Sequence, residues 1–376
     1  MEKILTASSI LIKIGSSFTR ETQGLTKEEG CRHFFIIPGN NGPRWLLPDN
    51  SNLACCVLKD WQPYSLLSLL KWILIQKLYS LNLISMVPSI GVVNAPFNNC
   101  KVPGNDDELI PVIYVGTPGY QQKAVATLIN TTSGEAVSVM KTALSEGGAS
   151  SVLKEARMLD YLSHTGVKNI PRLLAIDEHK QQSWQSVVSG KPSSKKFSQL
   201  HINWLLQLPH NGEHITLDQQ NTQLAERLES NRDKFTRSQQ DRLEQGISYI
   251  KGNSLIPLLL VHGDFAPWNI KVQSNLDKQE IAVIDWEDAR IDGLPLWDIS
   301  HFYLIQAHLF NTPELITDLL SNSLTHSYME KCGITDVDVK SLVLLYILFS
   351  SLNNSKNTDE HYKNYLIQTI SRIIKQ

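Results

Sequence analysis

The sequence predicts an α+β fold in which a strand-rich region precedes a mainly helical region. From about Glu108 to Ser189, short apolar runs separated by turn residues indicate several strands and one helix. From about Phe197 to Gln376, most apolar residues follow helical spacing, and a strand-like island from Leu258 to Asp285 interrupts them. The two regions together predict an α+β architecture.

The chain has 376 residues, which is too long for one ordinary domain. We expect an N-terminal extension at 1–105, a strand-rich lobe at 106–190, and a mainly helical lobe at 191–376. Pro96–Asp107 is rich in Pro, Asn, Gly and Asp, which is typical of a linker. Gly190–Lys196 is a hydrophilic turn, and we predict that it is a hinge.

Composition excludes several classes of protein. Hydrophobic residues make up 42% and charged residues 19%, which indicates a soluble, globular chain. The formal net charge is -2, so nothing suggests a nucleic-acid partner. The 5 cysteines are irregularly spaced and include no C-x-x-C pair, which favours reduced thiols and a cytoplasmic location.

The extension contains one predicted hairpin and one predicted helix. Phe34–Ile37 and Arg44–Leu47 flank an Asn-Gly turn, a pattern typical of a β-hairpin. Tyr64–Val87 is the most apolar segment, but Lys71 and Lys77 argue against a membrane span. Its leucines follow helical spacing, so we predict a helix packed in the core. A second interpretation is an amphipathic helix that contacts a membrane surface or a partner.

The strand-rich lobe has clear candidate elements. A helix capped by Ser150 or Ser151 is expected to run to about Leu162. The predicted strands are Ile110–Val115, Ala124–Asn130, Ala136–Met140, Leu173–Ile176 and Ser186–Val188.

Two motifs in the helical lobe carry polar groups at the ends of apolar runs. Leu258–Val261 leads into His262-Gly263-Asp264, and Asn269 follows Asp264 after four residues. A second apolar run, Ile281–Ile284, ends on Asp285. Both patterns predict short strands that deliver polar side chains to one site.

This arrangement suits phosphoryl transfer, which depends on positioning and on cations over the phosphate oxygens. Mg²⁺ prefers oxygen ligands, and Asp285 and Asn269 each offer one. Asp264 is placed to accept the proton of an attacking hydroxyl. The structural alternative is that His-Gly-Asp forms a tight turn and that Asp285 caps the next element.

Together, the two motifs resemble those of the aminoglycoside phosphotransferase and choline kinase family, which has a protein-kinase-like fold. The resemblance covers about Glu108 to His301. It implies that Asp264 is the catalytic base and that Asn269 and Asp285 hold the metal. It further implies that His262 and the later Asp298 support the loop structurally.

The resemblance also implies nucleotide-binding residues in the strand-rich lobe. Lys141, at the end of a predicted strand, would contact the nucleotide phosphates, and Glu155 on the next helix would hold its ammonium group. Gly116 and Gly119 lie where a phosphate-covering loop belongs, although the full G-x-G-x-x-G pattern is missing. An ordinary hairpin turn is the alternative there. Gln185–Ser189 is the candidate for contact with the adenine edge.

Some residues near the motifs have two interpretations. Trp268 and Trp286 either line the acceptor pocket or pack in the core. Glu287, Asp288 and Asp292 either attract a cationic acceptor or form a solvated acidic turn.

The resemblance therefore implies a two-lobed kinase-like enzyme with a small β-rich lobe, a mainly helical lobe and an N-terminal extension. Its substrates would be ATP or GTP, with Mg²⁺, and the hydroxyl of an amino sugar, sugar or amino alcohol. The alternative is a catalytically silent kinase-fold protein that binds or scaffolds. None of these residues selects the acceptor or distinguishes ATP from GTP.

Overall fold

The computed structural model describes residues 5–16, 20–22, 31–96, 102–103, 108–275, 278–353 and 359–376. It divides into two compact units. The first comprises Met1–His164 and Ile170–Pro192, and the second comprises Thr165–Asn169 and Ser193–Gln376. Most of the linker predicted at 96–107 lies outside the described residues.

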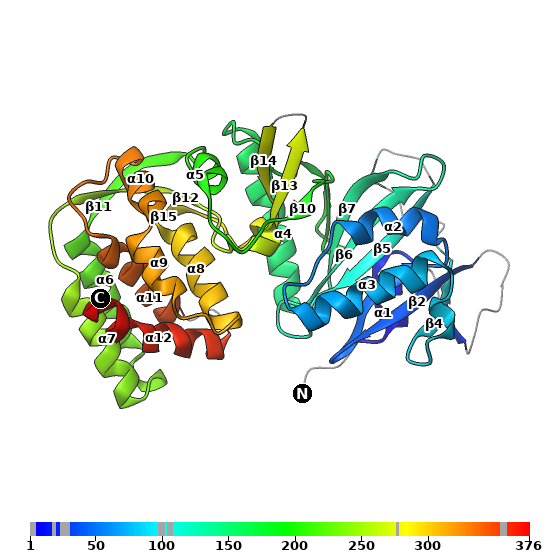
Figure 1. Cartoon of the computed structure of the whole chain (residues 1–376), viewed down its shortest axis with the longest axis horizontal. Coiled ribbons are helices and arrows are strands. Elements are labelled where there is room, and N and C mark those ends of the chain that lie inside the picture. Colours follow the sequence, from blue (N-terminus) through cyan, green and yellow to red (C-terminus); the bar gives the residue numbers. More distant parts are fainter. Residues whose placement is uncertain are drawn as a thin grey trace. The chain divides into compact units, whose positions relative to one another are not determined.

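The first unit is built on one antiparallel sheet with strand order β1-β4-β2-β3-β5-β6-β7-β9-β8 (Figure 1). Its strands are β1 (Arg20–Thr22), β2 (Arg32–Gly39), β3 (Gly42–Pro48), β4 (Gly91–Ala95), β5 (Leu109–Val115), β6 (Lys123–Asn130), β7 (Ala136–Ala143), β8 (Leu173–Asp177) and β9 (Gln182–Gln185); the short β10 spans Lys191–Pro192. Its helices are α1 (Ala7–Ile14), α2 (Ser51–Lys59), α3 (Leu66–Ser80) and α4 (Glu146–Ser163), with a 3-10 turn, η1, at Ile84–Met86.

The predicted hairpin of the extension is confirmed as β2 and β3. Gly42 has φ 113°, a left-handed value that glycine adopts without a Cβ clash, and it follows the Asn40-Asn41 turn. β3 also pairs with β5 through Trp45 opposite Tyr114. The extension and the strands after Glu108 therefore share one sheet.

Alternating side chains of this sheet supply two separate cores, because successive strand residues point to opposite faces. Phe34 and Leu46 pack with Ile10 and Leu11 of α1. On the other face, the neighbouring strand residues pack with α2 and α3. Members of this second core include Phe35, Ile37, Trp45, Leu47, Ala54, Leu58, Trp72 and Tyr79.

The prediction that Tyr64–Val87 is a core helix is wrong for most of its leucines. Within α3 only Trp72 and Tyr79 are buried, and Leu66, Leu67 and Leu70 are exposed. The helix is apolar on two faces, so helical spacing alone could not select the one that packs on the sheet. None of the helices in the described part of the chain has the length and hydrophobicity needed to cross a bilayer.

Other element boundaries also differ from the prediction. α4 starts at Glu146 and is capped by Ser145, whose Oγ accepts from the N–H of Gly148 at 3.1 Å, so the cap is not Ser150 or Ser151. The strand expected at 186–188 is instead β9, which ends at Gln185. β7 continues to Ala143, so Lys141 lies within the strand rather than at its end.

The second unit is mainly helical, with two small antiparallel arrangements of strands. β11 (His210–Thr216) and β15 (Arg290–Gly293), neither of them predicted, flank β12 (Leu255–Val261). β13 (Ile270–Asn275) pairs with β14 (Lys278–Val283). The helices are α5 (Gln199–Leu205), α6 (Leu217–Ser230), α7 (Arg237–Tyr249), α8 (Trp297–Leu309), α9 (Leu315–Ser321), α10 (Ser323–Lys331), α11 (Val339–Leu352) and α12 (Glu360–Lys375), and the 3-10 turns are η2 (Arg232–Lys234), η3 (Pro267–Asn269) and η4 (Trp286–Asp288).

The core of this unit forms around α8 and α11. Both helices are buried on nearly every side, and their sequences are accordingly apolar with few charges. Buried polar side chains on α8 are the exception, and two of them, Asp298 and His301, lie one helical turn apart on the same face of the helix. This exception marks the candidate site.

Candidate active site

The His-Gly-Asp motif forms a loop directly after β12, as the apolar run before it predicted. β12 is buried from Ile256 onward, which fixes the start of the loop. His262 is fully buried, and its Nε2 donates to the carbonyl of Ile284 at 3.0 Å. Its Nδ1 then accepts from the backbone N–H of Asp264 at 3.3 Å. Both ring nitrogens of His262 are therefore engaged in hydrogen bonds to the backbone.

Gly263 is required for two steric reasons. Its φ is 85°, in the left-handed region that residues with a Cβ rarely adopt. A Cβ at this position would also lie 2.3 Å from the carbonyl oxygen of Asp288. The motif therefore needs glycine between His262 and Asp264.

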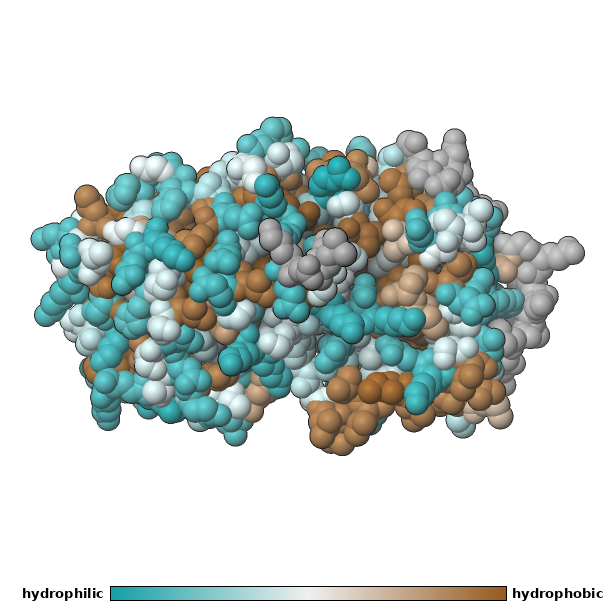
Figure 2. Space-filling view, turned by 45° about the horizontal axis from the view of Figure 1, so that its top comes forward, coloured by the Kyte–Doolittle hydropathy of each residue, from teal (hydrophilic) through white to brown (hydrophobic). Residues whose placement is uncertain are grey.

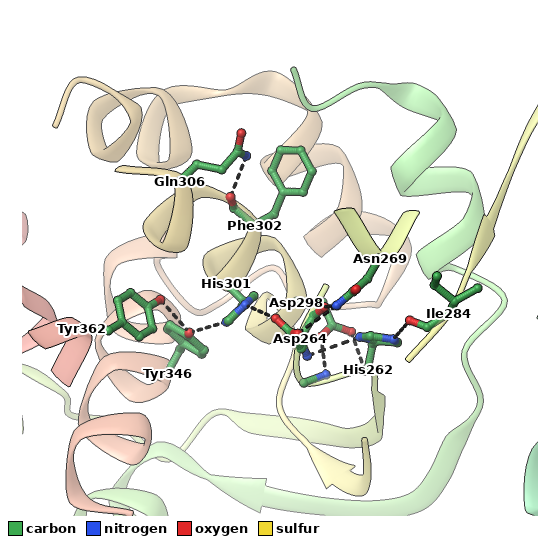
Figure 3. A network of polar contacts seen from close by, with 11 residues as sticks. His262, Asp264, Asn269, Ile284, Asp298, His301, Phe302, Gln306, Tyr346 and Tyr362 are labelled. Atoms are coloured by element: carbon green, nitrogen blue, oxygen red, sulfur yellow. Dashed lines mark hydrogen bonds and ion pairs between the residues drawn. The ribbon is translucent and has the colours of Figure 1, made fainter. Parts of the chain in front are cut away.

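The Asp264 carboxylate is held at both oxygens (Figure 3). Nε2 of His301 lies 2.8 Å from Oδ1, and Nδ2 of Asn269 donates to Oδ2 at 2.8 Å. The side chain of Asp264 is nevertheless 31% exposed, whereas that of His301 is 11% exposed. The carboxylate is thus fixed from its buried side and open on another.

Asn269 has its amide group oriented by Asp264. Nδ2 donates both to the carboxylate and to the backbone carbonyl of Asp264, at 2.8 and 3.0 Å. Both partners can only accept, which identifies the atom facing them as the nitrogen. The amide oxygen of Asn269 therefore points away from Asp264.

Asp285 follows β14 in an unusual backbone conformation. Its φ and ψ are 72° and 64°, which Asp tolerates better than most residues. The preceding residue, Ile284, donates its N–H to the carbonyl of Asn269 at 2.9 Å and accepts from His262. The backbone that carries Asp285 is therefore tied to the loop that carries Asp264 and Asn269.

Asp298 holds the start of the same loop. Its two oxygens accept the backbone N–H groups of His262 and Gly263, at 2.8 and 2.9 Å. Burial raises the pKa of Asp298, although the neighbouring His262 and the two backbone N–H donors act in the opposite direction. The N-terminus of α8 is in this way bonded to the loop.

His301 was not predicted as a site residue from the sequence, because a single histidine on an apolar helix has no unique interpretation. It lies three residues after Asp298, on the same helical face, and this spacing was the signal available. Its second ring nitrogen, Nδ1, lies 2.8 Å from the hydroxyl of Tyr346. The hydroxyl of Tyr362 lies 3.1 Å from that of Tyr346, so a chain of polar contacts leads from α12 to Asp264 (Figure 3).

Lys141 and Glu155 form a pair in the first unit. Nζ of Lys141 lies 2.6 Å from both carboxylate oxygens of Glu155, and both side chains are buried. The pairing across β7 and α4 is the one that the resemblance to the family implied. The pair belongs to the first unit, and Asp264, Asn269, Asp285, His262 and Asp298 belong to the second.

Gly116 and Gly119 lie in the connection between β5 and β6. The N–H of Gly116 donates to the carbonyl of Lys123, and the N–H of Gln122 donates to the carbonyl of Gly119. The connection also contacts the start of α4: Ser145 Oγ donates to the carbonyl of Tyr120 at 2.6 Å, and a Cβ on Gly148 would lie 2.2 Å from the carbonyl oxygen of Gln122. The glycines of α4 thus permit its close approach to this loop, a role that the sequence did not reveal.

For some residues near Asp285, the structure decides between the two interpretations that the sequence allowed. Trp286 is fully buried and donates Nε1 to the carbonyl of Val283, so it belongs to the core. Trp268 is half-buried. Asp292 is paired with Arg290 through two contacts of 2.7 and 2.8 Å, which compensates its charge.

The loop, its carboxylates and the buried Lys–Glu pair contain the residues on which the resemblance to the aminoglycoside phosphotransferase and choline kinase family is based. The sequence model of the phosphotransferase enzyme family (APH) matches residues 126–320, more than half of the chain. The chain therefore belongs to this family. The predictions of family, of enzyme class and of an α+β, kinase-like fold are confirmed.

Solved structures of similar fold include several transferases. Macrolide 2'-phosphotransferase MphH from Brachybacterium faecium is 13% identical, with a TM-score of 0.45 over 68% of this chain and 90% of that one. Choline kinase LicA from Streptococcus pneumoniae is 13% identical, with a TM-score of 0.44 over 72% and 95%. Aminoglycoside 2'-phosphotransferase-IIIa in complex with GDP is 16% identical, with a TM-score of 0.44 over 71% and 93%. No curated protein matches the chain at a significant level.

Proposed function

We propose that this protein is a small-molecule kinase that transfers the γ-phosphoryl group of ATP or GTP to a hydroxyl of an amino sugar, a sugar or an amino alcohol. The observation that carries the proposal is the Asp264 carboxylate, fixed at both oxygens by His301 and Asn269 and still partly open to solvent. A base needs this combination of fixed geometry and access to the acceptor.

In the proposed reaction, Asp264 accepts the proton of the acceptor hydroxyl. The hydroxyl oxygen forms a new bond to the γ-phosphorus, and the bond from that phosphorus to the β,γ-bridging oxygen breaks. The products are a nucleoside diphosphate and a phosphomonoester. Each Asp264 oxygen accepts one hydrogen bond in the structure and can accept a second, so it can receive the hydroxyl without losing His301 or Asn269.

Asn269 and Asp285 fit a magnesium ion. The amide oxygen of Asn269 is directed away from Asp264, and Asp285 adds a carboxylate from a backbone tied to the same loop. Mg²⁺ is commonly held by one or two such oxygens together with the substrate phosphates. When bound, it would neutralise charge on the phosphate oxygens.

The remaining predicted residues have supporting roles in this proposal. Lys141 contacts the nucleotide phosphates, and Glu155 orients the ammonium group of Lys141. The 2.6 Å contacts between the two side chains support this arrangement. Gly116 and Gly119 provide the loop over the phosphates. His262 and Asp298 maintain the loop that positions Asp264, because each bonds to its backbone.

The nature of the acceptor is suggested by relatives only in broad terms. Their names include an aminoglycoside phosphotransferase, a macrolide phosphotransferase and a choline kinase. All of these names fit a small molecule with a free hydroxyl.

The test is nucleotide consumption by the purified protein with Mg²⁺ and a panel of aminoglycosides, amino alcohols and monosaccharides. We expect turnover with one class of acceptor, and a loss of at least about 100-fold in Asp264→Asn. Turnover that survives in Asp264→Asn would remove Asp264 from the role of base. Tight Mg²⁺-nucleotide binding without turnover on any acceptor would favour the alternative of a kinase-fold binding or scaffold protein.

A further inference from the structure

His301 contacts the proposed base from behind. Its side chain is the more buried of the two, and Nε2 lies 2.8 Å from Oδ1 of Asp264. The acceptor must reach Asp264 from its exposed side, so His301 is not placed to touch the acceptor. Any effect of His301 on the reaction must therefore act through the carboxylate.

Asp264 and the tyrosines behind His301 together fix which ring nitrogen carries the proton, because a carboxylate can only accept while a tyrosine hydroxyl can donate. Burial raises the pKa of Tyr346 and of Tyr362, so both hydroxyls keep their protons at neutral pH. Tyr346 can then donate to Nδ1 of His301, with Tyr362 donating to Tyr346 in turn. A neutral imidazole that accepts at Nδ1 carries its proton on Nε2, the atom that faces Asp264.

We infer that His301, backed by Tyr346 and Tyr362, is a positioning residue that holds Asp264 Oδ1 in the orientation needed for the reaction. This inference rests on the proposed function of Asp264. It assigns a functional role to α11 and α12, which carry no recognised motif. The hydrogen bond on Oδ1 leaves Asp264 fewer orientations, and misplacement of a reacting group by about 1 Å can cost about 100-fold in rate.

Two substitutions of His301 form a matched pair. The amide of Gln can place a nitrogen near the position of Nε2, whereas the shorter Asn reaches only the position of Nδ1. We expect His301→Gln to keep kcat within about 10-fold of wild type and His301→Asn to lose about 10- to 100-fold. The KM for the nucleotide should change little in both, because Asp264 acts on the acceptor. Tyr346→Phe should lower kcat by a smaller factor.

A double variant separates positioning from general stability. If His301 acts through Asp264, Asp264→Asn with His301→Asn should be no slower than Asp264→Asn alone, because residues that act as a unit are not additive. Equal losses in the Gln and Asn variants, or additive losses in the double variant, would overturn the inference. Turnover that survives Asp264→Asn alone would instead overturn the proposed function.

A separate observation concerns the outer face of α3. On this face, large apolar side chains lie fully or largely in solvent, among them Leu67 at 74%, Leu70 at 57% and Met86 just after the helix at 75%. The set continues with Leu66, Ile73, Leu74, Leu81 and Leu83. Figure 2 shows an extended brown surface along the lower edge of the right-hand part of the molecule. A contiguous apolar area on a protein surface usually marks a binding site.

The charges within and after α3 in the sequence have one sign. From Trp61 to Asn105 the sequence contains lysines but no Asp or Glu, and Lys71 and Lys77 of α3 are exposed. Two copies of the chain that met through this face would bring like charges together. Aliphatic side chains bordered by lysines instead match the surface of a bilayer with anionic headgroups, because lysine stems can extend to the headgroups. We propose that the outer face of α3 docks on such a bilayer surface.

Cosedimentation with lipid vesicles tests this second proposal. We expect the wild-type protein to bind vesicles of phosphatidylcholine mixed with phosphatidylglycerol better than vesicles of phosphatidylcholine alone. Leu70→Gln with Leu74→Gln should reduce binding at least about 10-fold, since each buried leucine contributes to the apolar term. Leu309→Gln is the matched control, because Leu309 is similarly exposed at 54% but lies on α8.

Other outcomes would overturn the proposal. Equal binding by the wild type and the Leu70/Leu74 variant would show that this face is not the contact. A wild-type dimer that dissociates in the Leu70/Leu74 variant, measured by light scattering, would assign the face to a second copy of the chain. Unchanged melting temperatures are required of all variants.

Discussion

Helices α8 and α3 break the usual amphipathic pattern in opposite ways. α8 carries Asp298 and His301 in the core, whereas α3 carries leucines in solvent. Asp298 and His301 each have defined partners: Asp298 accepts from two backbone N–H groups, and His301 lies between Asp264 and Tyr346. The exposed leucines of α3 belong to neither core of the first unit. Asp298 and His301 thus identify partners within the molecule, while the exposed apolar face of α3 indicates a partner outside it.

The largest expected effect concerns the buried pair of Lys141 and Glu155 in the first unit. Lys141→Met should lower the free energy of unfolding by about 3–5 kcal/mol, because it leaves the Glu155 carboxylate buried without its partner. Lys154→Met, on the same helix as Glu155 but exposed, should change it by less than about 0.5 kcal/mol. Urea unfolding measures both. Similar values for the two variants would mean that burial of the pair has no energetic consequence.

A smaller effect is expected for Asp298 itself. Asp298→Asn keeps one oxygen but presents an amide nitrogen to a backbone N–H of the loop, so one buried donor loses its acceptor. We expect a loss of about 1–3 kcal/mol in the free energy of unfolding. Asp292→Asn, which breaks only the surface contact with Arg290, should cost less than about 1 kcal/mol. Equal costs would contradict the structural role of Asp298.

His201 gives a prediction in pH. Its neighbours are two serines and the ring of Phe197, and burial lowers the pKa of His201 to about 4. The folded protein therefore keeps His201 neutral, while the unfolded chain protonates it near its ordinary pKa of about 6.5. Stability from this residue is complete above pH 6.5 and falls as the pH drops towards 4, by at most about 1.4 kcal/mol per pH unit.

Substitution of His201 isolates this contribution. In His201→Gln, glutamine can still complete the capping box with Ser198, but it does not titrate. The difference in free energy of unfolding between wild type and variant should therefore decrease from pH 7 to pH 4.5. A difference that is independent of pH would show that His201 is not held neutral in the folded state.

The smallest effect belongs to α3. Leu70→Gln with Leu74→Gln should change the free energy of unfolding by less than about 1 kcal/mol, because both side chains are exposed. By contrast, Trp72→Ala on the packed face should cost about 3–5 kcal/mol. Comparable losses would mean that the outer face of α3 contributes to a core.

The motif residues could be placed from the sequence because each follows a buried strand or lies at a fixed spacing. Asp264 and Asn269 lie at one site, as the two motifs predicted, and Lys141 meets Glu155, as the resemblance to the family implied. His301 could not be selected, because its importance depends on Tyr346, which is 45 residues away on another helix. Only tertiary packing brings those residues together.

Elsewhere, local signals were ambiguous for identifiable reasons. The cap of α4 is Ser145 and not the predicted Ser150 or Ser151. Gly147 and Gly148 look unfavourable for a helix until their close approaches to Tyr120 and Gln122 are known. α3 has apolar residues on two faces, so its periodicity did not indicate which one packs on the sheet. The pairing of β3 with β5, which joins the extension to the main sheet, is a long-range contact that no local pattern encodes.

The most direct test of the central claim is phosphorus NMR of a reaction containing the protein, Mg²⁺, ATP or GTP and the acceptor found in the panel. The proposed function predicts a new phosphomonoester signal that grows in equal amount with the nucleoside diphosphate and that is absent with Asp264→Asn. Release of inorganic phosphate alone, or an unchanged phosphomonoester signal with Asp264→Asn, would contradict it.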